Sequence, residues 1–307
     1  MSRILIIKHG SLGDIVFALP VIHSINIHFA KRKEIDLLTD KKYLSFLKVS
    51  KYFNSVIEDN RSKNIFITLK LLFNLIRNKY DLVIDLQNSS RTSYYNLFFR
   101  LFSLSKISSS RKYAHFRYII PVQGTETSTQ GLFNQINLLN IKKISNIQYD
   151  WLQEKLSAKY NNKLVLLIPG VSKNGKYKQW DPKKFGELAQ YCEKKNYQIC
   201  IVGTNNDYES VLPILNNCKN IINCIDISPP SIIYSIAKKS TLIVTNDTGP
   251  GHIASLSGNK TLWIVNENKI TASNIDVNPK NLKMSSYYLN DITSQQVINF
   301  INDNNLL

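Results

Sequence analysis

The chain has 307 residues, of which 43% are hydrophobic, and its 39 Lys and Arg residues against 22 Asp and Glu give a formal net charge of +17. This length predicts two domains of ordinary size, and the hydrophobic share is high enough to exclude a disordered chain. No apolar run of about eighteen residues occurs and no small-residue cleavage site follows the first apolar run, so we expect neither a transmembrane helix nor a signal peptide.

The excess positive charge predicts an anionic partner, and nucleic acid, anionic lipid and nucleotide-sugar phosphates all qualify. The cysteines show no C-x-x-C spacing, which argues against a zinc or redox motif. We interpret them as reduced, buried thiols of a cytoplasmic protein. They are Cys192, Cys200, Cys218 and Cys224.

The first half of the chain alternates short apolar strands with amphipathic helices. In chain order we predict a strand at 3–10, a helix at 11–29, strands at 34–40 and 55–59, a helix at 67–79 and a strand at 80–87. Continuous apolar strands separated by helices are typical of βαβ units, in which helices cover a parallel sheet.

The second half repeats this alternation. We predict strands at 163–170, 197–204, 241–245 and 261–265 and helices at 181–195, 207–215, 253–256 and 292–301. Asp181 is the expected N-cap of its helix, and Pro182 occupies the first helical position. We therefore place one doubly wound domain at 1–150, a second at 151–285, and at 286–307 a C-terminal helix that packs back on the first domain.

The stretch 241–261, TLIVTNDTGPGHIASLSGNKT, is the most informative about function. A strand runs into a turn containing Asp247, Thr248 and Gly249, and a short helix follows. Unpaired backbone N–H groups at the start of a helix bind phosphate, and here the imidazole of His252 lies close in sequence. The pattern predicts an anion site, with a plain strand-to-helix connection as the alternative.

The loop from His9 to Asp14 connects the first strand to the first helix. In open α/β sheets, ligands bind beyond the carboxyl ends of the strands, where this loop lies. Gly10 and Gly13, on either side of Ser11, allow the backbone to approach a ligand closely. The loop lacks a full G-x-G-x-x-G or a G-K-[ST], which argues against a dinucleotide site or a P-loop. Alternatively, Asp14 only stabilises the helix dipole from the first turn.

Another strand end opens into the loop that carries Ser172, Lys176 and Lys178. Lysine binds phosphate as a point charge, so this loop suits a diphosphate. A solvated basic loop is the alternative, because lysine is common at protein surfaces.

The loop at 203–209 contains Asp207 and Glu209. Carboxylates at the end of a strand in this position accept hydrogen bonds from ribose hydroxyls. Their alternative role is to cap the helix that follows.

The stretch 86–125 contains no Asp or Glu and mixes basic with aromatic side chains. This mixture suits a membrane interface or an amphiphilic anionic ligand, and it also suits stacked single-stranded nucleic acid. The alternative is a set of core aromatics with a solvated basic face. The candidate contacts to an acceptor or a membrane are Arg91, Arg111, Lys112 and Arg117.

Three segments occur in the order found in one known family: ILIIKHGSLGDIVFALPVI, LLIPGVSKNGKYKQW and TNDTGPGHIASLSG. Together they resemble the signatures of glycosyltransferase family 9, the lipopolysaccharide heptosyltransferases. The D-T-G-x-x-H part is specific, whereas the region 86–150 is only loosely similar.

The resemblance implies a GT-B architecture, in which two Rossmann-like, doubly wound domains face each other across a cleft. It implies inverting transfer of a heptose from an ADP-heptose donor to a lipopolysaccharide core or related anionic glycolipid acceptor, without a metal ion or other cofactor. From the cysteines and the basic-aromatic stretch we expect the protein in the cytoplasm, peripherally on the cytoplasmic face of the inner membrane, and we expect no nucleic-acid partner.

The resemblance also assigns roles to individual residues. The catalytic base of the family falls on Asp14, and the loop near acceptor and donor comprises Gly10, Ser11 and Gly13. The donor-binding residues fall on Ser172, Lys178, Asp207 or Glu209, Asp247, Thr248, Gly249 and His252.

The chain departs from the family pattern at two places: SKNGKY at 172–177 looks inserted, and Asn266-Glu267 replace the usual glycine. A Rossmann oxidoreductase is a rival interpretation, but it needs a complete dinucleotide fingerprint. A nucleic-acid-binding protein needs a recognised binding module. A non-catalytic nucleotide-sugar-binding protein on the same fold is a further alternative, and the presence of Asp14 argues against it.

Overall fold

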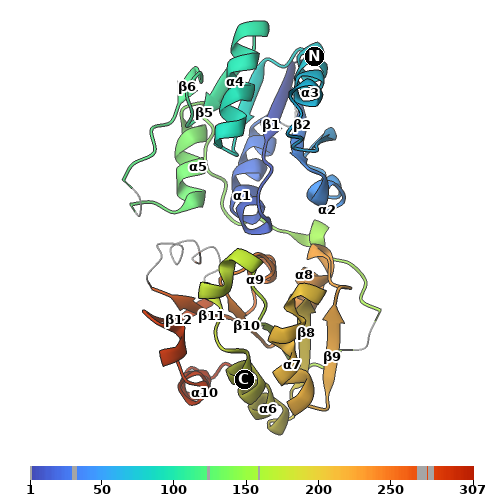
Figure 1. The fold of residues 1–307 in the computed structure, drawn as a ribbon, viewed down its shortest axis with the longest axis vertical. Helices are drawn as coiled ribbons and strands as arrows, with labels where there is room; N and C mark the ends of the chain where they lie inside the picture. The colour runs from blue at the N-terminus through green and yellow to red at the C-terminus, as the bar shows by residue number, and fades with distance from the viewer. Residues whose placement is uncertain (1, 30–32, 123–124, 158–159, 268–274, 276–279) are drawn as a thin grey trace. The chain divides into compact units, whose positions relative to one another are not determined.

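The computed structural model describes residues 2–29, 33–122, 125–157, 160–267, 275 and 280–307. The chain divides into two compact units, Met1–Gln148 and Tyr149–Leu307, so the first ends two residues before the expected boundary at 150. Figure 1 shows the fold of both units and labels most of their helices and strands.

The first unit contains a six-stranded, all-parallel sheet of order β3-β2-β1-β4-β5-β6. Its strands are β1 (Ser2–Ile7), β2 (Lys33–Asp40), β3 (Ser55–Asp59), β4 (Leu82–Asp85), β5 (Lys106–Ser109) and β6 (Phe116–Arg117). Its helices are α1 (Leu12–Phe29), α2 (Leu44–Lys48), α3 (Ile65–Arg77), α4 (Ser90–Phe102) and α5 (Ser128–Asn137), with the 3-10 turn η1 (Lys41–Tyr43).

The second unit has a sheet of the same kind, of order β12-β11-β10-β7-β8-β9. Its strands are β7 (Leu164–Ile168), β8 (Gln198–Gly203), β9 (Ile221–Ile225), β10 (Leu242–Asn246), β11 (Thr261–Asn266) and β12 (Asn281–Ser286). Its helices are α6 (Pro182–Lys194), α7 (Tyr208–Asn217), α8 (Pro230–Lys239), α9 (Gly249–Ser255) and α10 (Ser294–Asp303). The 3-10 turns are η2 (Asp150–Leu152), η3 (Lys173–Lys178), η4 (Asn205–Asp207) and η6 (Leu289–Asp291).

In both sheets the chain starts at a central strand, moves outwards, and returns to the other side of that strand. The direction therefore reverses between β1 and β4 in the first unit and between β7 and β10 in the second. At such a switch point the loops leave a crevice at the carboxyl ends of the strands, where α/β proteins bind ligands. The loops at 9–14, 169–180 and 246–252 all begin at these strand ends.

The predicted α/β class with two doubly wound halves is confirmed. Asp181 caps α6 by accepting a hydrogen bond from the Lys183 N–H (2.9 Å), as expected, and Pro182 follows at the first position. The helices α2, α4, α5 and α8 and the strands β5, β6, β9 and β12 were not predicted from the sequence. Most of these strands are short or lie at sheet edges with partly exposed residues, so their apolar pattern is weak.

α1 is long and apolar enough to cross a membrane by length and composition, with a mean hydropathy of 1.4. A core helix meets the same criterion, and 56% of this helix is buried. Ile15, Leu19 and Ile25 are completely buried. We therefore interpret α1 as a core helix of the first unit.

α10 packs against α6 within the second unit, whereas we expected it to pack back on the first domain. Val297 and Ile301 are fully buried in the core that contains Trp180 and Phe185. The Trp180 indole N–H donates to the Ile292 carbonyl just before α10 (2.8 Å). The apolar spacing correctly indicated a helix with one buried face, but spacing alone does not identify the surface that covers this face.

We expect Ile301→Ala to lower the free energy of unfolding of the second unit by about 2–5 kcal/mol, because it leaves a cavity in a close-packed core. Urea denaturation followed by Trp fluorescence, which includes the signal of buried Trp180, measures this change. Asn299→Ala, on the exposed face of the same helix, is the control and should change stability by less than about 0.5 kcal/mol. Equal effects of the two substitutions would contradict the packing of α10.

Candidate functional site

Asn246 organises the switch point of the second unit. It ends β10, is fully buried, and donates through its side-chain amide to the Pro169 carbonyl beyond β7 (2.8 Å). Its amide oxygen accepts a hydrogen bond from the Trp180 N–H (3.0 Å). One side chain thus ties together both strand ends and the loop before α6, and so positions the next residue, Asp247. Asn246 lies in the stretch 241–261, but no role was predicted for it from the sequence.

Asp247 lies between two cationic or polar partners, one for each carboxylate oxygen. The Lys178 ammonium donates to Oδ2 at 2.5 Å, and His252 Nε2 lies 3.1 Å from Oδ1. Burial alone would raise the pKa of Asp247, but its hydrogen bonds with His252 and Lys178 lower that pKa below the usual range. The group is therefore an ionised carboxylate with an ammonium beside it.

His252 is 5% exposed, and its ring centroid lies 4.8 Å from that of Trp263 on β11. α9 begins at Gly249, earlier than the expected 253, with Thr248 as its N-cap residue. The helix lies so close to β10 that a Cβ at Gly251 would come within 2.4 Å of the Thr245 hydroxyl. A larger residue at 251 would push the start of the helix away from the strand end.

The inserted-looking segment at 172–177 forms the 3-10 turn η3, of which Lys178 is the last residue. Its register brings Lys178 to Asp247, whereas the Lys176 ammonium donates to the Gln179 side chain (3.2 Å). Ser172 is exposed at the start of the turn. The structure therefore brings the expected lysine, and not its neighbour in the turn, to the D-T-G-x-x-H segment.

Asp207 has the capping role that was its alternative. Its carboxylate accepts hydrogen bonds from the Thr204 N–H (2.9 Å) and hydroxyl (3.0 Å). It also lies beside the end of β7, because a Cβ at Gly170 would come within 2.4 Å of the carboxyl carbon. Glu209 is exposed in the first turn of α7. Of the two acids, Asp207 is the one positioned next to the glycine loop.

At the second departure from the family pattern, the Glu267 carboxylate accepts a hydrogen bond from the Ser285 hydroxyl (2.5 Å). The backbone N–H of Glu267 donates to the Ser286 carbonyl (3.0 Å), which extends the pairing of β11 with β12.

In the first unit, Ser11 and Asp14 form reciprocal capping bonds at the start of α1. The Asp14 carboxylate accepts a hydrogen bond from the Ser11 N–H (2.9 Å), and the Ser11 hydroxyl accepts one from the Asp14 N–H (3.4 Å). Gly10 has a φ of 73°, a conformation that favours glycine. Asp14 therefore caps the start of α1, which was its alternative role. Its side chain is nevertheless exposed beyond the end of β1.

The loop that carries Asp14 is anchored across the switch point by Gln87, which follows β4. The Gln87 amide oxygen accepts hydrogen bonds from the backbone N–H groups of His9 (3.0 Å) and Gly10 (2.9 Å). Lys8 is buried and donates to the Leu86 carbonyl (3.1 Å). Burial lowers the pKa of Lys8, and the nearby charges of Asp14 and Asp85 oppose this shift. Neither Gln87 nor Lys8 was singled out from the sequence.

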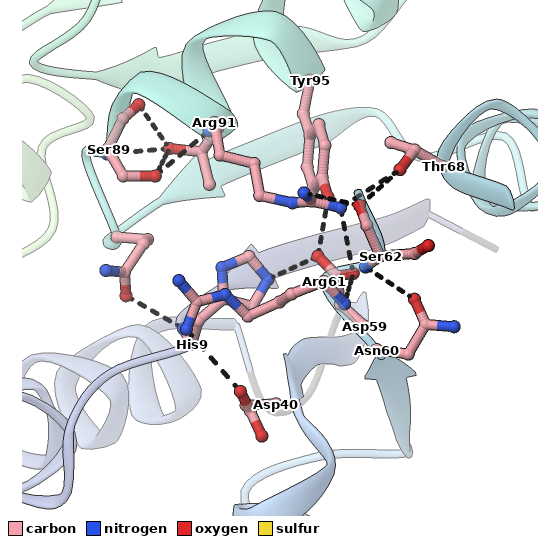
Figure 2. A network of polar contacts seen from close by, with 12 residues as sticks. His9, Asp40, Asp59, Asn60, Arg61, Ser62, Thr68, Ser89, Arg91 and Tyr95 are labelled. Carbon is pink, nitrogen blue, oxygen red and sulfur yellow. Dashed lines mark hydrogen bonds and ion pairs between the residues drawn. The ribbon is translucent and has the colours of Figure 1, made fainter. Parts of the chain in front are cut away.

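A buried polar network lies beside this loop (Figure 2). Its centre is Asp59 at the end of β3, which is fully buried and lies 2.9 Å from His9 Nε2. The carboxylate also accepts hydrogen bonds from the Tyr95 hydroxyl (2.7 Å) and the Arg61 N–H (2.8 Å). Burial would raise the pKa of Asp59, but the hydrogen bonds from His9 and Tyr95 lower it to about 2. A carboxylate at the last position of the predicted strand 55–59 was the available signal for this residue.

Arg91 belongs to the same network, so the expectation that it contacts an acceptor or a membrane is not supported. Its guanidinium donates to the Tyr95 hydroxyl (2.6 Å), the Ser62 carbonyl (3.0 Å) and the Thr68 hydroxyl (3.1 Å) (Figure 2). A single sequence cannot show this, because the partners lie 23 and 29 residues away in the chain.

The other basic candidates of this region lie at the surface. Arg111 is exposed and donates to the Asn88 carbonyl (2.6 Å), Arg117 is exposed and lies 3.5 Å from the Ser110 carbonyl, and Lys112 is exposed. The aromatic residues of 86–125 differ in exposure: some belong to the core and others lie at the surface. Tyr95, Phe98 and Phe99 are buried, while Tyr94 and Phe102 are exposed.

Arg61 is a candidate that the sequence analysis missed. It follows Asp59 with a φ of 50°, and its half-exposed guanidinium lies 3.7 Å from the Asp40 carboxylate beyond β2 (Figure 2). It thus presents an exposed cation at the carboxyl edge of the sheet, beside the loop of Asp14.

The four cysteines are buried and unpaired, as expected. Within the part of the chain that the structure describes, no three His, Cys, Asp or Glu side chains cluster as a metal site requires.

The family model for "Glycosyltransferase family 9 (heptosyltransferase)" matches residues 68–262, which is more than half of the chain. The match includes the Lys178–Asp247–His252 cluster, while Asp14 lies before it. Among curated proteins, the lipopolysaccharide heptosyltransferase 1 of Campylobacter coli is 23% identical over 98% of each chain.

Three solved structures of similar fold are named as heptosyltransferases or as a family 9 glycosyl transferase. ADP-heptose lps heptosyltransferase II of E. coli has a TM-score of 0.80 at 16% identity, covering 98% of both chains. A family 9 glycosyl transferase of Veillonella parvula has a TM-score of 0.79 at 17% identity, covering 98% of this chain and 96% of that one. The E. coli heptosyltransferase WaaC with ADP has a TM-score of 0.76 at 16% identity, covering 99% and 98%.

The lowered pKa of Asp59 predicts a pH dependence of stability. Its folded pKa of about 2 lies below the ordinary value of 3.8, so its contribution is complete above pH 3.8 and is lost as the pH falls towards 2. We expect the difference in unfolding free energy between wild type and Asp59→Asn to shrink by about 2 kcal/mol over this range. Denaturation at several pH values measures it, with Asp303→Asn, at an exposed carboxylate, as the control. A difference that stays constant with pH would contradict the assigned pairing.

Proposed function

The chain belongs to glycosyltransferase family 9, and on that premise we propose that it transfers a heptose from ADP-heptose to the core of a lipopolysaccharide or a related anionic glycolipid, with inversion and without a metal ion. The names of the similar proteins support the donor and the acceptor class. The observation that carries the proposal is the Lys178–Asp247–His252 cluster at the switch point of the second unit.

The cluster suits the departure of a nucleoside diphosphate. In the reaction the bond between the anomeric carbon and the diphosphate oxygen breaks, and the electron pair leaves with ADP. Lys178 is placed to offset the charge that develops on this leaving group, helped by Thr248 and the backbone N–H groups at the start of α9. Asp247 accepts hydrogen bonds from the donor sugar, and His252 holds Asp247 in place.

In this proposal Asp14 is the general base. The acceptor hydroxyl oxygen forms the new bond to the anomeric carbon from the face opposite the leaving group, and its proton passes to the Asp14 carboxylate. One displacement of this kind inverts the anomeric centre. The support is the position of Asp14, exposed beyond β1 on a loop that Gln87 anchors.

We assign the acceptor to the first unit. Its exposed cations at or near the carboxyl edge of the sheet, Arg61, Arg111, Lys112 and Arg117, suit the phosphate and carboxylate groups of an anionic glycolipid. A lipid acceptor places the enzyme peripherally at the cytoplasmic face of the inner membrane. The proposal attributes the positive charge of the chain to these anionic groups and to lipid, not to nucleic acid.

Asp14→Asn should lower turnover by about 10²–10⁴-fold, because the amide cannot accept the proton. Donor binding, measured by calorimetry, should remain within about threefold of wild type, because the base does not hold the diphosphate. Ser11→Ala removes the hydroxyl that accepts the Asp14 N–H at the start of α1 and leaves the Asp14 carboxylate in place, so it is the matched variant. A comparable loss of turnover in Ser11→Ala would indicate that Asp14 acts on the helix and not on the acceptor.

Lys178→Ala should weaken binding of ADP-heptose by at least about tenfold, because a charge-assisted contact to phosphate is lost. Calorimetry with the donor measures the dissociation constant. Lys176→Ala is the control, since this lysine lies in the same turn but donates to Gln179. If Lys176→Ala weakens the donor and Lys178→Ala does not, the assigned register is wrong.

A further inference from the structure

An exposed apolar ridge covers α3 and the end of α4 in the first unit. Its members are far more exposed than large apolar side chains usually are: Phe66 (76%), Phe73 (49%), Leu101 (65%), Phe102 (57%) and Leu104 (101%). Phe73 and Phe102 connect the two helices at the centre of the ridge, because their ring centroids lie 6.3 Å apart and both rings pack on Phe98. A contiguous exposed apolar surface of this kind marks an interaction site.

The outward face of α3 alternates aromatic and basic side chains. Phe66, Lys70, Phe73 and Arg77 are spaced by four, three and four residues, so they share one helix face, and all four are exposed. The opposite face contributes the buried residue Leu75 to the core. α3 therefore uses one face for the fold and presents a second, apolar and basic face to its surroundings.

The two segments that contain the helices of the ridge have no acidic residue, and exposed Asp81 follows the first of them. Residues 60–80, which contain α3, include no Asp or Glu but five Lys or Arg: Arg61, Lys63, Lys70, Arg77 and Lys79. Residues 86–125, which contain α4, also include no Asp or Glu. Both helices of the ridge thus lie in purely basic segments.

We propose that the α3–α4 ridge docks on an anionic lipid surface. Apolar side chains that insert at the interface, with lysine and arginine at the headgroups, are the features of interfacial membrane binding. A second copy of the chain would bring two basic surfaces together, which is unfavourable. Single-stranded nucleic acid binds by stacking its bases on aromatic rings. The aliphatic side chains of Leu101 and Leu104 cannot stack with bases, which argues against nucleic acid as the partner.

The role of this docking in sugar transfer rests on the proposed function, which supplies the lipid acceptor. A lipid acceptor is confined to the membrane, so an enzyme held on the same surface meets it at a higher local concentration. The ridge should therefore affect transfer to a membrane-embedded acceptor and not the chemistry itself. It also moves the membrane contact away from Arg91, whose guanidinium is hydrogen-bonded within the unit.

Vesicle cosedimentation tests the docking without any substrate. Wild type should bind phosphatidylethanolamine vesicles that contain phosphatidylglycerol, and Phe66→Ser with Leu104→Ser should weaken this binding by at least about tenfold. Both side chains point to solvent, so circular dichroism should be unchanged. Ile227→Ser with Tyr288→Ser removes two other exposed apolar side chains, from the second unit (66% and 64%), and should bind like wild type.

Charge variants test the basic part of the ridge. Lys70→Gln with Arg77→Gln should weaken binding to the anionic vesicles by about fivefold per charge removed, and less at high salt. Lys238→Gln with Lys239→Gln, at the end of α8, is the control of equal charge and should have a smaller effect.

Several outcomes would overturn the docking proposal. In the first, the Phe66/Leu104 variant binds vesicles as well as wild type does. In the second, wild type binds vesicles equally well without phosphatidylglycerol. In the third, the variant retains vesicle binding but loses oligonucleotide binding or self-association. Turnover separates this inference from the proposed function. With a water-soluble acceptor that lacks lipid chains, the Phe66/Leu104 variant should turn over like wild type. If wild type transfers sugar to neither acceptor, the proposed function fails, while the vesicle result still decides the docking.

Discussion

A parallel sheet that is buried on both faces can present polar chemistry only where its strands end. Strands such as β1 and β7 consist almost entirely of fully buried aliphatic residues, so their middle positions have no room for charge. The order of the strands then decides which ends lie together. Because both sheets reverse direction at the central strand, β1 meets β4 and β7 meets β10, and every candidate residue of the two sites lies at or just beyond the carboxyl edge of a sheet.

The carboxylates at these edges are paired, because a buried charge without a partner is costly. Asp59 is held by His9, Tyr95 and a backbone N–H, and Asp247 by Lys178 and His252. The pairing keeps both groups ionised, with their hydrogen bonds already oriented. Beside Asp247, the Lys178 ammonium is already oriented at the place assigned to a diphosphate. A preorganised charge of this kind lowers the free energy of an anion that develops during the reaction.

The two units use their charge differently in the proposed reaction. The second unit offers a compact cluster in which a lysine, an aspartate and a histidine contact one another. The first unit offers an anchored loop with Asp14, several exposed cations and the apolar ridge on α3 and α4. This division is consistent with a small, highly charged donor on one side and a large amphiphilic acceptor on the other, and it gives a physical role to much of the net charge of +17.

The amino-acid sequence by itself determined the α/β class, most central strands and the position of the D-T-G-x-x-H segment after a strand, because these features depend on local apolar spacing and on contiguous segments. It also assigned Lys178 and Asp247 to one site through a family resemblance. Only the tertiary structure decided which lysine of the turn reaches Asp247, that α10 packs on α6, that Arg91 is hydrogen-bonded within the first unit, and that Asp59, Gln87 and Asn246 position the loops. These outcomes depend on contacts between residues far apart in the chain. The local spacing of residues does not identify the surface that packs on a helix face or the acceptor that pairs with a hydrogen-bond donor.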